Sequence, residues 1–413
     1  MPMTSQRRCR APKDRFRPGH RLGSGPMASP RLLATFVALS GLLLACSPAA
    51  PPDAGPSTGP SGSPDMQPMA TTAPLPEAPA TCDLAALPAR DKLAQLLTVG
   101  VTDAADARAV VADHHVGGIM IGSWTDLSML TDGSLGDIAA SAAPLPLAVS
   151  VDEEGGRVSR LASLIGSQPS ARELARTKTA DEVYGIALDR GRKMRDLGVT
   201  VDFAPVVDVT DAAADTVIGD RSFGSDPAVV TEYAGAYARG LRDAGVLPVL
   251  KHFPGHGHAS GDSHTGGVTT PPLDVLMGDD LVPYRTLTGQ APVAVMVGHM
   301  QVPGLTGSDP ASLSPAAYNL LRSGGYGGPG FGGLVYTDDL SSMGAINQRY
   351  GVADAVLRAL QAGADNALWI TTAEVPAVLD RLEQALASGE LNQGAVDASL
   401  QRNAAVKGPL RCG

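Results

Sequence analysis

Short apolar segments alternate with longer segments of helical composition through most of the chain. Several of the apolar segments are nearly continuous in Val, Ile, Leu and Ala, which is typical of strands buried on both faces of a parallel sheet. The expected strands are Leu96–Val101, Val116–Ile121, Pro146–Asp152, Thr200–Val207, Leu247–Phe253, Val293–Met300, Gly333–Asp338 and Ala367–Ile370. Helical composition is clearest in Ala180–Leu197, Pro227–Ala244, Pro315–Arg322, Ala353–Ala362 and Val375–Ala387.

This alternation predicts an α/β fold of the (β/α)8 TIM-barrel type, built as one catalytic domain over residues 82–413. A doubly wound open sheet is the competing fold. That fold would normally place a glycine fingerprint after the first strand, and Gly100-Val101-Thr102 does not match one. The barrel is therefore the predicted architecture.

The start of the chain has the features of an export signal. Arg31 precedes the apolar run Leu32–Ala45, which is shorter than the roughly 20 residues needed to span a bilayer. Leu43-Leu44-Ala45-Cys46 resembles the bacterial lipobox, in which the cysteine is lipidated. We expect residues 1–45 to be a leader, and Cys46 to anchor the exported protein at the outer face of the cytoplasmic membrane or in the cell wall. An ordinary secretory signal is the alternative, and Met27 is an alternative start.

Residues 46–81 are rich in Pro, Ser, Ala, Thr and Gly and have almost no large apolar side chains. Such a segment cannot bury enough surface to offset its ordering entropy, so we expect a disordered tether. Cys82 opens the predicted domain and Cys412 is the penultimate residue. In an oxidising exterior these two cysteines favour a disulfide that closes the domain, with two free thiols as the alternative.

Charge is distributed unevenly along the chain, which has a net charge of −10. Residues 1–32 carry eight Lys or Arg and one acid, a charge of +7, so the remainder carries −17. An acidic body argues against non-specific binding to nucleic acid, and no nucleic-acid partner is expected.

Polar residues follow five of the expected strands. The carboxyl ends of barrel strands meet on one rim, where barrel enzymes hold their reactive groups. These polar segments are Asp152–Arg160, Asp208 with Ile218–Gly224, Lys251–His264, His299 and Asp338–Asp339. Aromatic residues make up only 4% of the chain, so a ligand at this rim would be held mainly by hydrogen bonds. Hydroxyl-rich ligands such as sugars suit these side chains.

Four histidines lie within Lys251–His264, which raises the question of a metal site. Glycine and proline interrupt this segment, so no helix can place two of the histidines four residues apart. Calcium would require more carboxylates than Asp262 alone. We therefore expect no metal, and we expect His256 and His258 to hydrogen-bond the loop to itself.

A carboxylate nucleophile with a separate proton donor fits the remaining residues. No Gly-x-Ser-x-Gly elbow is present in the predicted domain, and Ser263 beside His264 lacks the geometry of a triad. Asp262 and His264 are two residues apart, so on an extended segment the carboxylate can contact the imidazole. This pair and an aspartate at the end of the Gly333–Asp338 strand would support double displacement at a glycosidic carbon. The alternation of side chains along a strand does not decide whether Asp338 or Asp339 is the nucleophile. For Asp262 and His264, the alternative is a solvated pair on the loop without a catalytic role.

Four motifs lie at the expected strand ends. They are Lys251-His252-Phe253-Pro254-Gly255-His256-Gly257 with Asp262-Ser263-His264, Val151-Asp152 with Glu154-Gly155-Gly156-Arg157-Val158, Ile218–Gly224, and Thr337-Asp338-Asp339-Leu340-Ser341. These motifs resemble those of glycoside hydrolase family 3, specifically the single-domain bacterial β-N-acetylhexosaminidases of the NagZ type. The resemblance covers most of residues 90–390.

The resemblance implies a retaining exo-β-N-acetylglucosaminidase that needs no cofactor. Asp338 would be the nucleophile, His264 the acid/base and Asp262 its assistant. The implied ligands of the N-acetylglucosamine hydroxyls are Asp152, Arg160, Arg221, Lys251 and His252. The substrates would be peptidoglycan-derived glycans and muropeptides, and we expect a monomer.

Two positions depart from the family pattern. Glu153 stands where a neutral residue or histidine is more common, and Ser342 precedes Met343 where many members have methionine directly after the first serine. Both changes could alter the sugar pocket. Three other functions stay open at this point: a β-N-acetylglucosaminide phosphorylase, a β-glucosidase and a non-catalytic glycan-binding lipoprotein.

Overall fold

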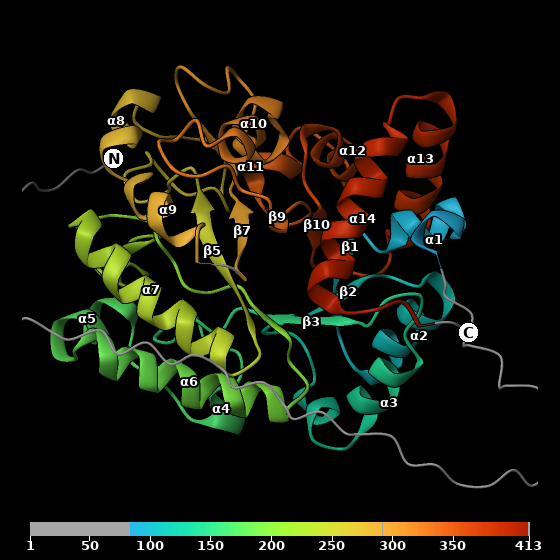
Figure 1. The fold of residues 1–413 in the computed structure, drawn as a ribbon, viewed down its shortest axis with the longest axis horizontal. Helices are drawn as coiled ribbons and strands as arrows, with labels where there is room; N and C mark the ends of the chain where they lie inside the picture. Colours follow the sequence, from blue (N-terminus) through green and yellow to red (C-terminus); the bar gives the residue numbers. More distant parts are fainter. Residues whose placement is uncertain (1–82, 291, 412–413) are drawn as a thin grey trace, which may run out of the picture. The chain divides into compact units, whose positions relative to one another are not determined.

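The computed structural model describes residues 83–290 and 292–411 (Figure 1). The predicted leader (1–45), the tether (46–81), the lipidation site Cys46 and the Cys82–Cys412 disulfide lie outside the described residues and stay predictions. Among the helices of the described residues, none has the length and hydropathy that a membrane span requires.

Eight parallel strands close into a barrel, which confirms the predicted (β/α)8 fold. Around the barrel the order is β1-β10-β9-β7-β5-β4-β3-β2. The strands are β1 Leu97–Val101, β2 Gly118–Ile121, β3 Ala148–Val151, β4 Val201–Asp202, β5 Leu247–Phe253, β7 Ala294–Val297, β9 Val335–Asp339 and β10 Asn366–Trp369. A separate two-stranded sheet pairs β6 (Val268–Thr269) with β8 (Met300–Gln301) beyond the barrel.

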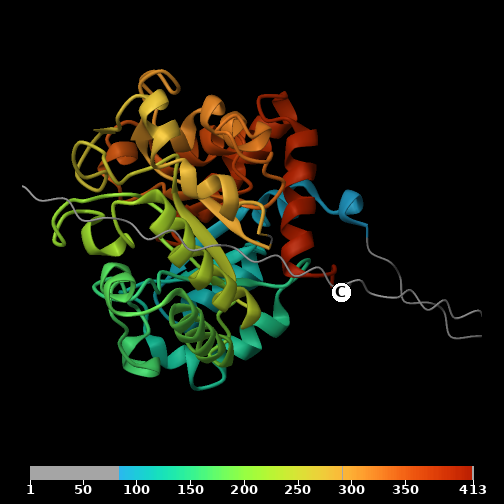
Figure 2. The same cartoon turned by 60° about the vertical axis from the view of Figure 1, so that its left-hand side comes forward.

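Helices surround the strands, and the α6–α7 and α13–α14 pairs lie on different sides of the barrel (Figures 1 and 2). The helices are α1 Ala89–Ala94, α2 Ala104–His114, α3 Ser134–Ser141, α4 Ala162–Ile165, α5 Ala171–Thr177, α6 Ala180–Asp196, α7 Pro227–Asp243, α8 Leu273–Gly278, α9 Val282–Leu287, α10 Pro315–Ser323, α11 Gly344–Asn347, α12 Val352–Ala362, α13 Val375–Ser388 and α14 Gln393–Lys407. The five helices predicted from composition correspond to α6, α7, α10, α12 and α13. Their starts carry recognisable signals, such as the Thr179–Glu182 capping box of α6 and the proline in the first turn of α7.

The fourth strand is shorter than predicted. Only Val201–Asp202 is strand, although the apolar pattern continued to Val207. Pro205 has no N–H to donate to a sheet ladder, which interrupts the regular pairing. The chain nevertheless stays beside β5, because the Lys251 N–H donates to the Pro205 carbonyl and the Val207 N–H donates to the Lys251 carbonyl. The irregular segment therefore still delivers its polar residues to the rim.

Alternate residues of most barrel strands divide between two apolar clusters, as the two-residue period of a strand requires. Val295 and Val297 of β7, for example, join the cluster packed against the helices, while Ala294 and Met296 join the second. The second cluster contains Met120, Ala148, Val201, Phe203, Leu247, Val249, Ala294, Met296, Leu334, Tyr336 and Leu368. These residues fill the barrel interior, so the barrel is a packed core and the space for a ligand lies at its carboxyl rim.

Candidate active site

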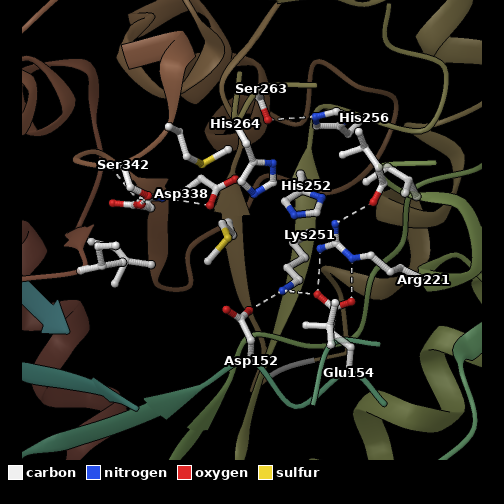
Figure 3. A pocket seen from close by; sticks show the side chains of 18 of the residues that line it. Asp152, Glu154, Arg221, Lys251, His252, His256, Ser263, His264, Asp338 and Ser342 are labelled. Atoms are coloured by element: carbon white, nitrogen blue, oxygen red, sulfur yellow. Dashed lines mark hydrogen bonds and ion pairs between the residues drawn. The ribbon is translucent and has the colours of Figure 1, made fainter. Parts of the chain in front are cut away.

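A cavity of about 380 Å³ opens at the carboxyl ends of the strands (Figure 3). All eight residues that the sequence analysis assigned to catalysis or substrate binding line it. They are Asp152, Arg160, Arg221, Lys251, His252, Asp262, His264 and Asp338. Met120, Met296 and Leu368 of the barrel interior also line the cavity, so the polar groups stand above an apolar floor.

Lys251, at the end of β5, bridges two carboxylates. Its Nζ lies 2.6 Å from Asp152 Oδ1 and 2.6 Å from Glu154 Oε1, and its side chain is 3% exposed (Figure 3). Burial alone would lower the pKa of Lys251, but the charges of Asp152 and Glu154 raise it. The ammonium therefore stays protonated and holds both carboxylates in place.

Glu154 also binds Arg221 through two parallel hydrogen bonds. Arg221 Nε donates to Oε2 and Nη2 donates to Oε1, each over 2.8 Å. Burial opposes ionisation of Glu154, yet the charges of Arg221 and Lys251 hold the pKa of its carboxyl far below the usual range. Because the same carboxylate fixes both cations, Glu154 organises two predicted substrate ligands, a role that its sequence motif did not reveal.

His252 is oriented from behind by Asp208. The Nδ1 of His252 lies 2.7 Å from Asp208 Oδ2, and the backbone N–H groups of His252 and His256 donate to Asp208 Oδ1. Asp208 is fully buried. Since the carboxylate accepts a hydrogen bond from the Nδ1–H group, the Nε2 atom of His252 is left to face a ligand.

Arg160 has a buried Nε atom without a hydrogen-bond partner in the part of the chain that the structure describes. Its backbone N–H donates to Glu153 Oε2 over 2.7 Å, which fixes the start of the side chain. A guanidinium with unused donors on a cavity wall is suited to binding hydroxyl or carboxylate oxygens.

The two adjacent aspartates at the end of β9 have different surroundings. Both oxygens of Asp339 are occupied, because Oδ1 accepts from the N–H and hydroxyl of Ser341 and Oδ2 accepts from the N–H and hydroxyl of Ser342. Asp338 accepts one bond, from the Asp339 N–H over 2.9 Å, and its carboxylate faces the cavity (Figure 3). Strand parity left the choice open, and this difference favours Asp338 as the group that meets a ligand.

His299 supports the end of β9 from the neighbouring strand. Its Nε2 lies 2.7 Å from the Asp339 carbonyl and must donate to it, while Nδ1 lies 2.6 Å from Ser312 Oγ. The ring is buried. The Asp339 backbone is therefore held by His299, and the Asp339 carboxylate is held by Ser341 and Ser342.

Asp338 is expected to stay ionised in moderately acidic solution. Burial opposes its ionisation, but the neighbouring His299, His252 and Lys251 side chains lower its pKa to about 2. A lowered pKa means that the carboxylate is lost only as the pH falls through that value, so roughly 99% is ionised at pH 4. For a glycosyl fluoride, whose leaving group needs little protonation, kcat/KM should change less than about threefold between pH 7 and pH 4.5. The fold is checked at each pH by circular dichroism. A sigmoidal loss of kcat/KM near pH 5 with the fold intact would contradict the lowered pKa of Asp338.

Asp262 and His264 form a contacting pair at the mouth of the cavity. Asp262 Oδ1 accepts from the backbone N–H of His264 over 2.9 Å and lies 2.7 Å from its Nδ1. Burial would raise the pKa of Asp262, but these two hydrogen bonds and the histidine charge lower it. The His264 side chain is 59% exposed, so its Nε2 can reach both a ligand and solvent. Figure 3 shows His264 and Asp338 directed at the same part of the cavity.

The loop that carries this pair is docked on the start of α11. Gly344 N–H donates to the His264 carbonyl over 3.0 Å, and Ala345 N–H donates to the Ser263 carbonyl over 3.1 Å. A Cβ at Gly344 would lie 2.7 Å from the Thr265 carbonyl carbon, closer than real contacts allow. The absence of a side chain at Gly344 therefore permits the loop to lie against the segment that follows Asp338.

Gly344→Ala should displace this loop while leaving α11 intact, because alanine is a good helix former and the nearest opposing atoms belong to Thr265 and Gly266 of the loop. We expect kcat to fall about tenfold or more, since misplacing a catalytic group by an ångström is costly. Gly351→Ala is the matched control, because a Cβ there meets no atom within 4 Å. Steady-state kinetics of the two variants make the comparison, and equal kcat values would show that loop docking does not matter for turnover.

The other two loop histidines differ in their partners. His256 is buried, its Nε2 lies 3.2 Å from Ser263 Oγ, and burial lowers its pKa to about 4. This neutral imidazole ties the loop to itself, as predicted. His258 was expected to do the same, but its Nδ1 lies 3.2 Å from Asp280 Oδ2, outside the loop, and this contact raises its pKa. His258 therefore fastens the loop base to the segment after α8.

Glu153 departs from the family pattern and was expected to alter the sugar pocket, but it does not reach that pocket. It is fully buried behind the rim, where it pairs with Arg190 and accepts from the backbone N–H groups of Arg160 and Leu161 over 2.7 Å each. Ser342, the second departure, does line the cavity. The extra acid is thus a structural ion pair that shapes the Arg160 segment.

Comparisons with known proteins identify the family. Residues 89–406 match the family described as Glycosyl hydrolase family 3 N terminal domain. The chain is 68% identical over 389 residues to Beta-hexosaminidase LpqI of Mycobacterium tuberculosis, covering 93% of this chain and 98% of that protein.

Solved structures give the same result. A glycosyl hydrolase of family GH3 from Mycobacterium smegmatis is 96% identical with a TM-score of 0.77, over 80% of this chain and 100% of that one. A family 3 β-N-acetylglucosaminidase from Paenibacillus sp. is 34% identical with a TM-score of 0.73, over 78% of this chain and 62% of that one.

Proposed function

Because the chain belongs to glycosyl hydrolase family 3, we propose that it is a retaining exo-β-N-acetylglucosaminidase acting on glycan fragments derived from peptidoglycan. The observation that carries the proposal is the shared cavity of Asp338 and the Asp262–His264 pair. In that cavity lie the Asp338 carboxylate, which forms no salt bridge within the described part of the chain, and the His264 imidazole, whose Nδ1 is held by Asp262. These are the two groups that double displacement requires.

In the first step the Asp338 carboxylate attacks the anomeric carbon while the bond from that carbon to the glycosidic oxygen breaks. His264, protonated on Nε2, donates this proton to the departing oxygen, and the aglycone leaves as an alcohol. Asp262 stabilises the imidazolium and keeps Nε2 directed away from itself, because it binds Nδ1 at 2.7 Å. The sugar is then held as an ester on Asp338.

In the second step neutral His264 removes a proton from water, and the water oxygen attacks the anomeric carbon. The bond to Asp338 breaks, the carboxylate is regenerated, and the sugar leaves with its original β configuration. The exposure of His264 supports this step, since water can reach the imidazole once the aglycone has gone.

The ligands of the terminal sugar are proposed to be Asp152, Arg160, Arg221, Lys251 and His252. Asp152 and Lys251 form one hydrogen-bonded unit, and a sugar hydroxyl can donate to the carboxylate and accept from the ammonium at once. The cavity of about 380 Å³ is closed at the barrel floor, which supports removal of a terminal residue over cleavage inside a long glycan.

The direct test is release of 4-nitrophenol from its N-acetyl-β-D-glucosaminide, with NMR detection of the first anomer formed. We expect the β anomer at first and slow mutarotation afterwards. Initial formation of the α anomer would exclude a retaining enzyme. The same reaction in phosphate buffer tests the phosphorylase alternative, because that enzyme would accumulate the sugar 1-phosphate, and the glucoside tests the β-glucosidase alternative.

We also propose that the exported protein is a monomer anchored through a lipidated Cys46. The support is the lipobox-like sequence before Cys46, which lies outside the described residues. Fractionation of cells carrying the wild type or Cys46→Ala tests the anchor: the wild type should sediment with membranes and the variant should not. Light scattering of the purified domain tests the monomer.

A further inference from the structure

Trp124 is the aromatic residue of the cavity. It lies in the turn after β2, its side chain lines the same cavity as Asp338, and it is 40% exposed. Among the described residues that line the cavity it is the sole Phe, Tyr or Trp. The indole lies over Gly122, where a Cβ would overlap the ring. One part of the ring is therefore supported by backbone while another part is open to a ligand.

The turn that carries Trp124 is rigid. Thr125 Oγ1 donates to the Val101 carbonyl over 2.6 Å and accepts from the Gly122 N–H over 3.0 Å. The Asp126 N–H donates to the Thr102 carbonyl over 2.8 Å, which fixes the far side of the turn to the end of β1. An indole held in this way loses little conformational freedom when a ligand packs on it, so the contact contributes more to binding.

Among the described residues that line the cavity, no charged side chain comes from β2, β10 or the segments that follow them. The charged groups proposed to hold the terminal sugar come from the ends of β3 and β5 and from the loop after β4. The segments after β2 and β10 instead contribute Trp124 and Ile370. Because β10, β1 and β2 are consecutive in the closed barrel, Trp124 and Ile370 lie on one side of the rim, here called the apolar side.

The chemistry fixes how a substrate lies between these charged groups and the apolar side. Its anomeric carbon must face Asp338 on β9, while the hydroxyls at the other end of the ring meet Asp152 and Lys251. The group attached to the anomeric carbon then leaves the cavity past β9 and along the apolar side. A pyranose in this position presents C–H bonds on its faces, and an aromatic ring is suited to pack against them.

We propose that Trp124 is the platform of the aglycone subsite and makes the enzyme selective for substrates in which a second sugar follows the terminal N-acetylglucosamine. This inference rests on the proposed function. It adds a specificity-determining residue that does not take part in bond cleavage.

The test compares two substrates that share the terminal sugar. N,N′-diacetylchitobiose has a pyranose aglycone, and N-acetyl-β-D-glucosaminyl fluoride has none. Trp124→Ala should lower the ratio of kcat/KM for the disaccharide to kcat/KM for the fluoride by about 10- to 100-fold, and Trp124→Phe should restore most of it. An unchanged ratio in Trp124→Ala overturns the proposal, whether both values fall together or neither falls.

Tryptophan fluorescence gives a second readout that does not depend on turnover. The chain has two tryptophans, and Trp369 is fully buried in the barrel wall. In an Asp338→Asn background, chitobiose should shift the emission of Trp124, and the shift should vanish in Trp124→Phe. An undiminished shift in that variant contradicts the proposal. Failure of the wild-type enzyme to cleave the glycosyl fluoride would instead reject the proposed function, so the two failures are distinguishable.

Discussion

Asp338→Asn is expected to lower kcat for the 4-nitrophenyl N-acetyl-β-glucosaminide by roughly 10⁴-fold or more, because it removes the group proposed to form the glycosyl ester. Asparagine keeps the size of the side chain and can still accept from the Asp339 N–H, so the fold should be retained. Steady-state kinetics with a thermal melt of each variant make the measurement.

Asp339→Asn is the matched control, because it changes the same group one residue later. There the substitution weakens hydrogen bonds from Ser341 and Ser342 without removing the nucleophile. Its effect on kcat should stay within about tenfold, in line with the loss of one or two hydrogen bonds. If Asp339→Asn is the inactive variant and Asp338→Asn retains activity, the assignment of the nucleophile is wrong.

His264→Ala is expected to have the second largest effect, and the effect should depend on the leaving group. For chitobiose, whose leaving oxygen needs a proton, kcat/KM should fall about 10²- to 10⁴-fold. For the 2,4-dinitrophenyl glycoside, whose leaving group is stable as an anion, kcat/KM should fall less than about tenfold. The second-order constant is used because it reports formation of the glycosyl ester alone.

Asp262→Asn should also lower kcat/KM more for poor than for good leaving groups, but by less than His264→Ala does. It removes the charge beside Nδ1 but leaves the imidazole in place. Sodium azide should accelerate turnover of the activated substrate by His264→Ala and give a β-glycosyl azide, since this small anion attacks the ester without base assistance. If His264→Ala lowers kcat/KM equally for good and poor leaving groups and azide has no effect, His264 supports the loop structure and does not transfer a proton.

Much of the fold could be predicted from the sequence because the apolar runs are buried on both faces. All eight barrel strands follow from that pattern, and helical composition located α6, α7, α10, α12 and α13, whereas α14 was not among the predicted helices. The exception is β4, where Pro205 ends the regular ladder while apolar residues continue. Hydropathy reports burial and not hydrogen bonding, so it could not locate the end of that strand.

Residues that position other side chains of the site were harder to predict than the residues that line the cavity in motifs. Asp338, His264 and the sugar ligands lie in motifs, and the structure brings them to one cavity. Asp208 and Glu154 hold His252 and Arg221 across separations of 44 and 67 residues, and no local pattern encodes such pairs. The same limit explains why Glu153 was expected to alter the sugar pocket: its partner Arg190 is 37 residues away on α6.

The central claim is that Asp338 carries the sugar during turnover. The most direct measurement treats the wild-type enzyme with 5-fluoro-N-acetylglucosaminyl fluoride, whose ring fluorine slows hydrolysis of the ester more than its formation is slowed. Intact-mass analysis and peptide sequencing should then find one glycosyl group per chain, attached to the peptide containing Asp338 at that residue. No adduct on an enzyme that turns over the fluoride, or an adduct on Asp339 or Asp152, would contradict it.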